Sequence, residues 1–86
     1  MTGAATQICS HKFDHRFFAL PLDVQRRVQG KIDEMGRRLD DFPHYHMERV
    51  DTYRLRIGDY RVNYQLYPAK NELYLIAIGH RRDIYK

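Results

Sequence analysis

The stretch YRLRIGDYRVNYQL, residues 53–66, decides the fold. Apolar and polar side chains alternate strictly on both sides of Gly58-Asp59, which is the pattern of two half-buried strands. A two-residue loop with glycine first is typical of a type II′ turn. The stretch therefore predicts an antiparallel hairpin with strands over 53–57 and 60–66.

The short turn also predicts which residues face one another across the hairpin. Because register follows from a two-residue loop, we expect Arg56 opposite Arg61 and Arg54 opposite Asn63. The alternating apolar residues share the other face and are expected to pack on helices; they are Tyr53, Leu55, Ile57, Tyr60, Val62, Tyr64 and Leu66.

Three arginines on one sheet face are unfavourable for folding alone. Like charges directly opposite one another destabilise a strand pair, and here Arg54 lies two residues from the Arg56–Arg61 pair. A guanidinium group can donate two hydrogen bonds to one phosphate and always keeps its positive charge, so the pattern favours a bound polyanion. The structural alternative is ion pairing with acids from the loop or the tail, such as Glu48, Asp51 or Asp83.

Helical periodicity precedes the hairpin. Apolar residues recur at spacings of three and four, which predicts one amphipathic helix with Pro21 in its first turn and an end before Asp40–Pro43; the stripe is Val24, Val28, Ile32, Met35 and Leu39. Asp14 is expected to cap a shorter helix that carries Phe17, Phe18 and Leu20.

The remaining segments complete a small α+β domain. Residues 1–6 are expected to be frayed, 7–13 to form a short, weak strand, and 43–51 to form a loop. Glu72–Gly79 is apolar on both faces, which indicates a central strand. The prediction is a single domain over residues 1–86, in which a small antiparallel sheet packs against two helices. The sheet consists of a three-strand C-terminal meander and the short N-terminal strand.

Composition narrows the class of protein. The 86 residues carry a net charge of +4, yet residues 1–52 hold eight basic and eight acidic side chains, while residues 53–86 hold seven against three. A local basic excess is typical of a polyanion-binding or acidic-partner surface. No apolar run is long enough for a membrane span, and the single cysteine excludes an intramolecular disulfide, so we expect a cytoplasmic protein with no membrane partner.

Metal and cofactor sites are not predicted. His44 and His46 have ligand-like spacing without a third ligand nearby, Cys9 is expected to be a small core residue, and no glycine-rich phosphate loop occurs. We expect no metal and no cofactor.

The tail GHRRDIYK, residues 79–86, supplies chemistry that a core does not need. If the last strand runs beside the hairpin, Gly79 lies near Arg61, and His80, Arg81 and Tyr85 can reach the arginine face. Fixed positive charges with one imidazole and one phenol suit general acid–base catalysis at a phosphodiester.

The block YRLR-x-GDYRV-x-Y, followed by an apolar strand and GHRRD-x-Y, resembles the RelE/ParE toxin superfamily of type II toxin–antitoxin systems, and its RelE branch most closely. The resemblance covers residues 53–86, and the helices over roughly 14–42 match it in layout. It implies a ribosome-dependent, metal-independent endoribonuclease that cuts mRNA in the A site. The 2′-hydroxyl would attack the adjacent phosphate and leave a 2′,3′-cyclic phosphate.

The resemblance also implies residue roles. Arg54 and Arg56 would be the cationic positions of the first hairpin strand, Arg61 the transition-state arginine, Arg81 the leaving-group acid or phosphate clamp, and Tyr85 the C-terminal tyrosine. Beyond the resemblance, we expect His80 to be catalytic, and Arg82 and Lys86 to join Arg54 and Arg56 in binding RNA phosphates. RelE relatives often carry lysines at the positions of Arg54 and Arg56. Because arginine does not release its proton, the general base is expected to be Tyr85, with His80 as the alternative.

Partners follow from the same resemblance. They are a cognate antitoxin protein, the ribosome with its mRNA, and operator DNA bound through the antitoxin. Two other functions stay open: a ParE-like toxin that inhibits DNA gyrase without catalysis, and an inactive relative that serves as a binding module.

Overall fold

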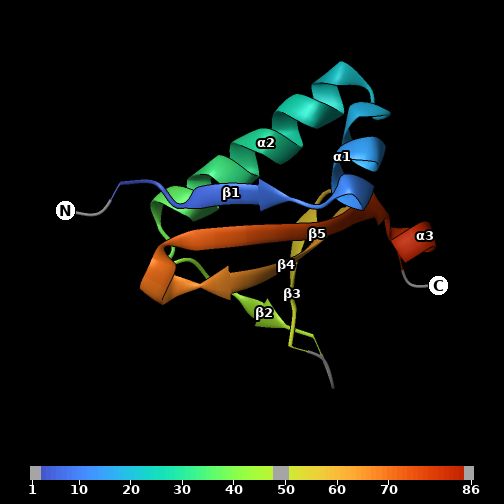
Figure 1. Ribbon diagram of the computed structural model, residues 1–86. Helices are drawn as coiled ribbons and strands as arrows, with labels where there is room; N and C mark the ends of the chain where they lie inside the picture. The colour runs from blue at the N-terminus through green and yellow to red at the C-terminus, as the bar shows by residue number, and fades with distance from the viewer. Residues whose placement is uncertain (1–2, 48–50, 85–86) are drawn as a thin grey trace.

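The computed structural model describes residues 3–47 and 51–84, and it shows two helices lying over one side of a sheet (Figure 1). The helices are α1 (His11–Phe18) and α2 (Leu22–Arg37), with a one-turn α3 (Arg81–Ile84) after the last strand. The strands are β1 (Thr6–Cys9), β2 (Tyr45–His46), β3 (Tyr53–Ile57), β4 (Tyr60–Tyr67) and β5 (Glu72–His80). Their order in the sheet is β1-β5-β4-β3-β2, which confirms the predicted α+β class.

The hairpin of β3 and β4 has the predicted register. Arg56 pairs with Arg61 and Arg54 with Asn63. Gly58 has a φ of +59° and Asp59 does not have a positive φ, as a type II′ turn requires. Val62 and Tyr64 are fully buried in the core with Ile32 and Met35 of α2.

A β-bulge in β5 explains why this strand looks apolar on both faces. Asn63 pairs with Ala77, but the next residue of β4, Tyr64, pairs with Leu75, so Ile76 is one residue too many. A bulge reverses the alternation along the strand. Leu75 and Ile78, which would otherwise lie on opposite faces, are therefore both buried in the same core.

Ser10 joins the bulge to the first helix. Its Oγ accepts a hydrogen bond from the backbone N–H of Phe13 (3.0 Å), so Ser10 and not Asp14 caps α1, which begins at His11. The same hydroxyl donates to the carbonyl of Ile76 (2.6 Å), and the Ser10 N–H donates to the Leu75 carbonyl (3.0 Å). One serine thus fixes the start of α1 against β5.

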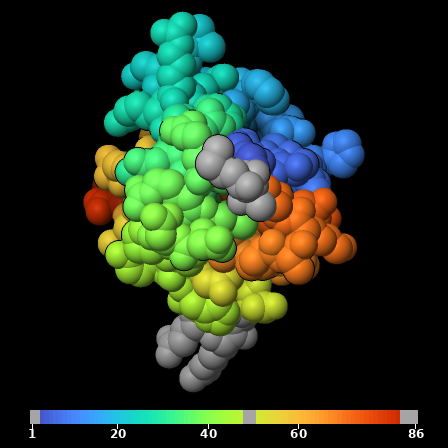
Figure 2. Space-filling model, turned by 90° about the vertical axis from the view of Figure 1, so that its left-hand side faces the viewer, coloured from blue at the N-terminus to red at the C-terminus, as the bar shows by residue number. Residues whose placement is uncertain are grey.

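The N-terminal segment differs from the prediction in three respects. The sheet is mixed, because β1 pairs with β5 in parallel. Ala5 is buried, and its N–H bonds the Gly36 carbonyl at 2.9 Å, so the segment expected to fray is fixed from Ala5 on. Cys9 is exposed, since it lies at the end of the edge strand β1. Figure 2 shows these blue residues lying between the end of α2, in green, and the orange turn before β5.

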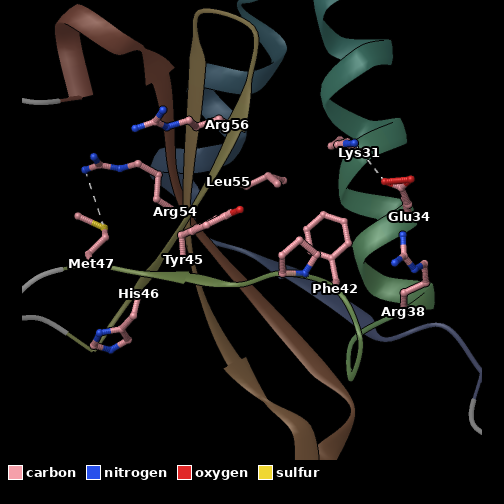
Figure 3. Close-up of a pocket in the computed structure, with 11 residues that line it drawn as sticks. Lys31, Glu34, Arg38, Phe42, Tyr45, His46, Met47, Arg54, Leu55 and Arg56 are labelled. Atoms are coloured by element: carbon pink, nitrogen blue, oxygen red, sulfur yellow. Dashed lines mark hydrogen bonds and ion pairs between the residues drawn. The ribbon is translucent and has the colours of Figure 1, made fainter.

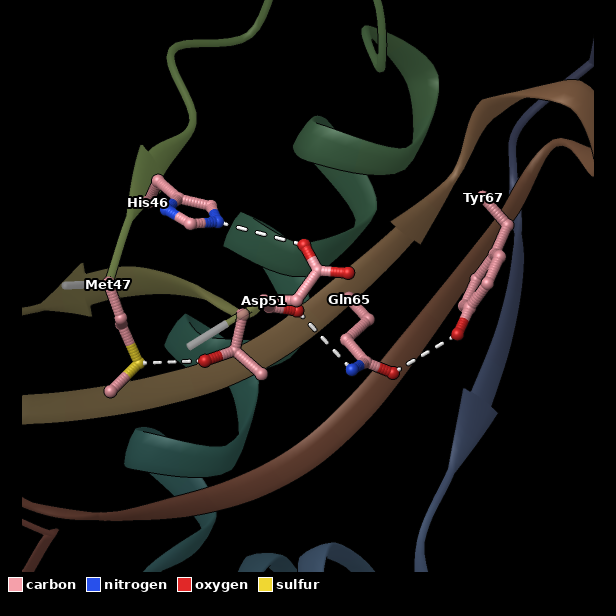
Figure 4. A network of polar contacts seen from close by, with 6 residues as sticks. His46, Met47, Asp51, Gln65 and Tyr67 are labelled. Carbon is pink, nitrogen blue, oxygen red and sulfur yellow. Dashed lines mark hydrogen bonds and ion pairs between the residues drawn. The ribbon is translucent and has the colours of Figure 1, made fainter. Parts of the chain in front are cut away.

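The predicted loop over 43–51 contains β2, which pairs Tyr45 with Arg54 and His46 with Tyr53. Side chains tie this edge to β4 (Figure 4): His46 Nε2 lies 3.7 Å from an Asp51 carboxylate oxygen, and Gln65 donates to the Asp51 carbonyl at 3.3 Å. No helix within the described ranges is long and apolar enough to span a bilayer.

Candidate nucleic-acid interface

The arginine face of the hairpin consists of Arg54, Arg56 and Arg61, and the three side chains differ in exposure. Arg56 is exposed, Arg54 is half-buried, and Arg61 is only 8% exposed. The expectation of three displayed guanidiniums is therefore wrong for Arg61. The cause is local, because Arg61 Nη1 donates to the carbonyls of Gly58 (2.9 Å) and Tyr60 (3.0 Å), which hold the guanidinium against the turn.

Two buried polar atoms on this face lack partners among the described residues. They are Arg61 Nε and Asn63 Oδ1, one donor and one acceptor two residues apart along β4. Burying such groups without hydrogen bonds is unfavourable, and the few native cases commonly mark functional positions. Arg61 is thus a rigidly held cation beside an amide oxygen that has no partner among residues 3–47 and 51–84.

The backbone of the tail meets the turn between β3 and β4, as expected for Gly79. Gly79 pairs with Arg61, and the N–H of Arg81 donates to the carbonyl of Asp59 at 2.7 Å. Helix α3 therefore begins on the turn that holds Arg61, and Arg81 and Arg82 are both exposed there. The ion pairs formed among the described residues involve none of Arg56, Arg61, Arg81 and Arg82.

His80 is not brought onto the arginine face. It pairs with Tyr60 across the sheet, and the two rings contact edge to face with centroids 5.7 Å apart. Tyr60 belongs to the helix-facing side of β4, so the bulge has turned His80 to that side as well. Its Nδ1 accepts a hydrogen bond from the Arg82 N–H at 3.3 Å. Tyr85 and Lys86 lie outside the described residues.

A groove next to the arginine face was not foreseen from the sequence. It has a volume of about 1030 Å³ and lies along the outer edge of β3, between α2 and β2 (Figure 3). Arg54 and Arg56 border it on one side and point away from α2, whereas Leu55 points toward α2. Lys31 borders it from α2, Arg38 from the residue just after α2, and Tyr45 from β2.

The two histidines that flank Tyr45 have separate environments. His44 bonds the Tyr64 hydroxyl (2.7 Å) and the Leu39 carbonyl (2.8 Å), whereas His46 contacts Tyr53 and Asp51. Burial raises the pKa of Tyr64, which keeps its hydroxyl protonated and able to donate to His44. Over the described ranges, no three His, Cys, Asp or Glu side chains are grouped as metal ligands. The sequence signal for the groove is the pair His44-Tyr45. In an extended segment, neighbouring side chains point to opposite faces, so one ring packs on the core and the next is exposed beside the groove.

Comparison with known proteins agrees with this fold. Residues 10–85 match the model of the family described as the ParE toxin of type II toxin–antitoxin systems, parDE. No curated relative matches the chain. A chain of the RelBE2 toxin–antitoxin complex from Mycobacterium tuberculosis is 18% identical, with 96% of this chain and 98% of that chain covered and a TM-score of 0.78.

Two further solved structures have the same fold. The isolated RelE toxin of E. coli is 18% identical, with coverage of 95% of this chain and 92% of that chain and a TM-score of 0.74. A chain of the RelE–RelB complex from Pyrococcus horikoshii is 20% identical, with coverage of 93% and 98% and a TM-score of 0.73. Since the family match spans almost the whole sequence and the architecture agrees with it, the chain belongs to the RelE/ParE superfamily of type II toxin–antitoxin toxins.

Proposed function

We propose that this toxin is a RelE-like endoribonuclease that cuts mRNA in the ribosomal A site without a metal ion. The observation that carries the proposal is the Arg56–Arg61 cross-strand pair, with Arg81 fixed on the same turn by its 2.7 Å backbone bond to Asp59. None of the ion pairs among the described residues involves these three arginines. Their positive charges can therefore stabilise the negative charge that develops on a phosphate during transfer.

Each residue has a distinct role in this mechanism. The 2′-hydroxyl attacks the adjacent phosphorus, and the negative charge of the transition state falls on the non-bridging oxygens. Arg61 suits their stabilisation, because two carbonyls already hold its guanidinium in place and little reorganisation is needed. Arg81 stabilises the departing 5′-oxygen, and Arg54, Arg56, Arg82 and Lys86 bind the flanking phosphates.

Tyr85 is the proposed general base. Neighbouring guanidiniums favour the phenolate form of a tyrosine, which then takes the proton of the attacking hydroxyl. His80 is assigned a positioning role in place of a basic one, because its Nδ1 lone pair already accepts the Arg82 N–H. It fixes the angle at which α3 leaves β5.

A protein antitoxin is the proposed partner. Solved relatives include complexes of RelE toxins with RelB antitoxins. An acidic or amphipathic segment of the antitoxin would cover the basic face and become ordered on binding. Binding to operator DNA would take place through the antitoxin in the complex.

The second candidate is a ParE-like toxin that blocks DNA gyrase, which the description of the matching family favours. The basic tail is common to both proposals. Under this alternative Tyr85 is dispensable, and replication stops before transcripts are lost. An inactive relative that acts as a binding module would be harmless when expressed without antitoxin.

Mapping transcript ends in cells that express the toxin separates these functions. We expect new ends inside open reading frames, and we expect Arg81→Ala and Tyr85→Phe to relieve growth arrest while antitoxin binding survives. Arg16→Ala, which removes an exposed arginine from α1, is the matched control and should remain toxic. Intact transcripts with arrested replication, or full toxicity of both tail variants, would contradict the proposal.

A further inference from the structure

Tyr45 is an exposed aromatic side chain beside the proposed site. It is 70% exposed, and none of the ring contacts between described residues involves it, whereas Tyr53, Tyr60 and Tyr67 each pack against another ring. Because Tyr45 pairs with Arg54 across β2 and β3, its position is set by the strand that carries the phosphate-binding arginines.

The groove that Tyr45 borders is rimmed by cations. Arg54 and Arg56 lie on the β3 side, and Lys31 and Arg38 on the α2 side (Figure 3). Lys31 contacts Glu34 at 3.2 Å and Arg38 contacts Asp41 at 3.6 Å, but both pairs are well exposed to water. Exposed pairs of this kind contribute little and yield readily to a phosphate.

We propose that this groove is a nucleotide-binding subsite, in which one base of the substrate RNA stacks on Tyr45 while its phosphates contact the cations that border the groove. The inference rests on the proposed function. An RNA strand that is cut beside Arg61 must continue on both sides of the cleaved bond, and the groove begins at Arg54 and Arg56, which belong to the arginine face. An aromatic platform within a cationic groove is the usual means of holding single-stranded nucleic acid.

An acidic peptide is the competing occupant, because it would also find cations and an apolar floor. An open aromatic ring at the mouth of the groove favours a base, since a stacked base uses the face of the ring and a peptide carboxylate does not. RNA is therefore the occupant that accounts for both Tyr45 and the cations.

The test is binding of a fluorescently labelled 2′-O-methyl RNA hexamer, in which the attacking hydroxyl is blocked. We expect Tyr45→Ala to weaken binding roughly 5- to 150-fold, the loss of one base–aromatic stack, and Tyr45→Phe to bind like the wild type. Phe18→Ala removes an equally exposed aromatic (69%) from α1, outside the groove, and should change nothing. Arg38→Gln should reduce the slope of log K against log salt by about 0.7, the value for one phosphate contact of a single strand.

Three results would overturn the inference: absence of hexamer binding by the wild type at low salt, equal binding by Tyr45→Ala, or loss in Tyr45→Ala of binding to a glutamate-rich decapeptide and not to RNA. Far-UV circular dichroism of each variant confirms that it is folded. Failure of the proposed function is recognised separately. If wild-type cells show no cleaved transcripts while hexamer binding still depends on Tyr45, the subsite stands and the nuclease assignment falls.

Discussion

Replacing Ser10 with alanine removes a hydroxyl that holds two elements together. Its Oγ accepts the Phe13 N–H at the start of α1 and donates to the Ile76 carbonyl in the bulge of β5. Loss of the cap costs about 1 kcal/mol, and loss of the second hydrogen bond costs about 1 kcal/mol more. Together they lower the free energy of unfolding by about 2 kcal/mol, out of the roughly 5–15 kcal/mol typical of a domain.

Urea denaturation followed by circular dichroism measures this loss, with the m-value expected to stay constant. For a chain of this size the melting temperature should fall by roughly 8–16 °C. Ser10→Thr keeps the hydroxyl and is the control. Replacing serine by glycine at a cap costs only a few tenths of a kcal/mol, so most of the stability lost in Ser10→Gly measures the hydrogen bond to Ile76. A loss below about 0.5 kcal/mol in Ser10→Ala would refute the idea that this residue anchors the bulge.

Three further predictions concern single groups. Hydrogen bonds from Gln7 and Gln29 hold the pKa of Asp33 below its ordinary value of 3.8. The resulting contribution to the free energy of unfolding is present above that value and is lost as the pH falls through the folded pKa. Asp33→Asn should therefore remove this contribution from the acid side of a plot of stability against pH. Gly58→Ala should cost about 1–2 kcal/mol in thermal denaturation, because φ at this position is +59°; a Tm unchanged from wild type would argue against strain there. Partial burial of the thiol and the nearby Asp14 carboxylate raise the pKa of Cys9, although the residue as a whole is exposed. Iodoacetamide should therefore alkylate it more slowly than free cysteine at mildly alkaline pH, and Asp14→Asn should speed the reaction; equal rates in the two proteins would contradict this.

Local chemistry accounts for the parts of the fold that were predictable. The Gly58-Asp59 turn and strict alternation fixed the β3–β4 register residue by residue, because a two-residue loop leaves no freedom in pairing. The apolar stripe of α2 was equally clear, although this helix ends at Arg37, ahead of the Leu39 end of the stripe. Both signals arise within one element.

The features that were missed depend on contacts between distant segments. The direction of β1 is set by pairing with β5, and no residue within Thr6–Cys9 encodes it. The bulge at Ile76 is a matter of pairing with β4, and its carbonyl is bonded by Ser10, 66 residues earlier, so the side on which His80 lies could not be read from alternation. Arg61 shows the same limitation, because its burial results from carbonyls of a turn whose sequence gives no hint that they capture a guanidinium.

Parallel pairing of β1 with β5 has a consequence for synthesis of the toxin. Thr6 pairs with Glu72, so β1 has no neighbour in the sheet until β5 has been synthesised. Contacts of such long range form late and slow the folding of small domains. The hairpin that carries Arg61 can form earlier, but Arg81 is placed on its turn only when β5 is complete. Chains released before β5 is made therefore lack the contact that places Arg81 on the turn beside Arg61.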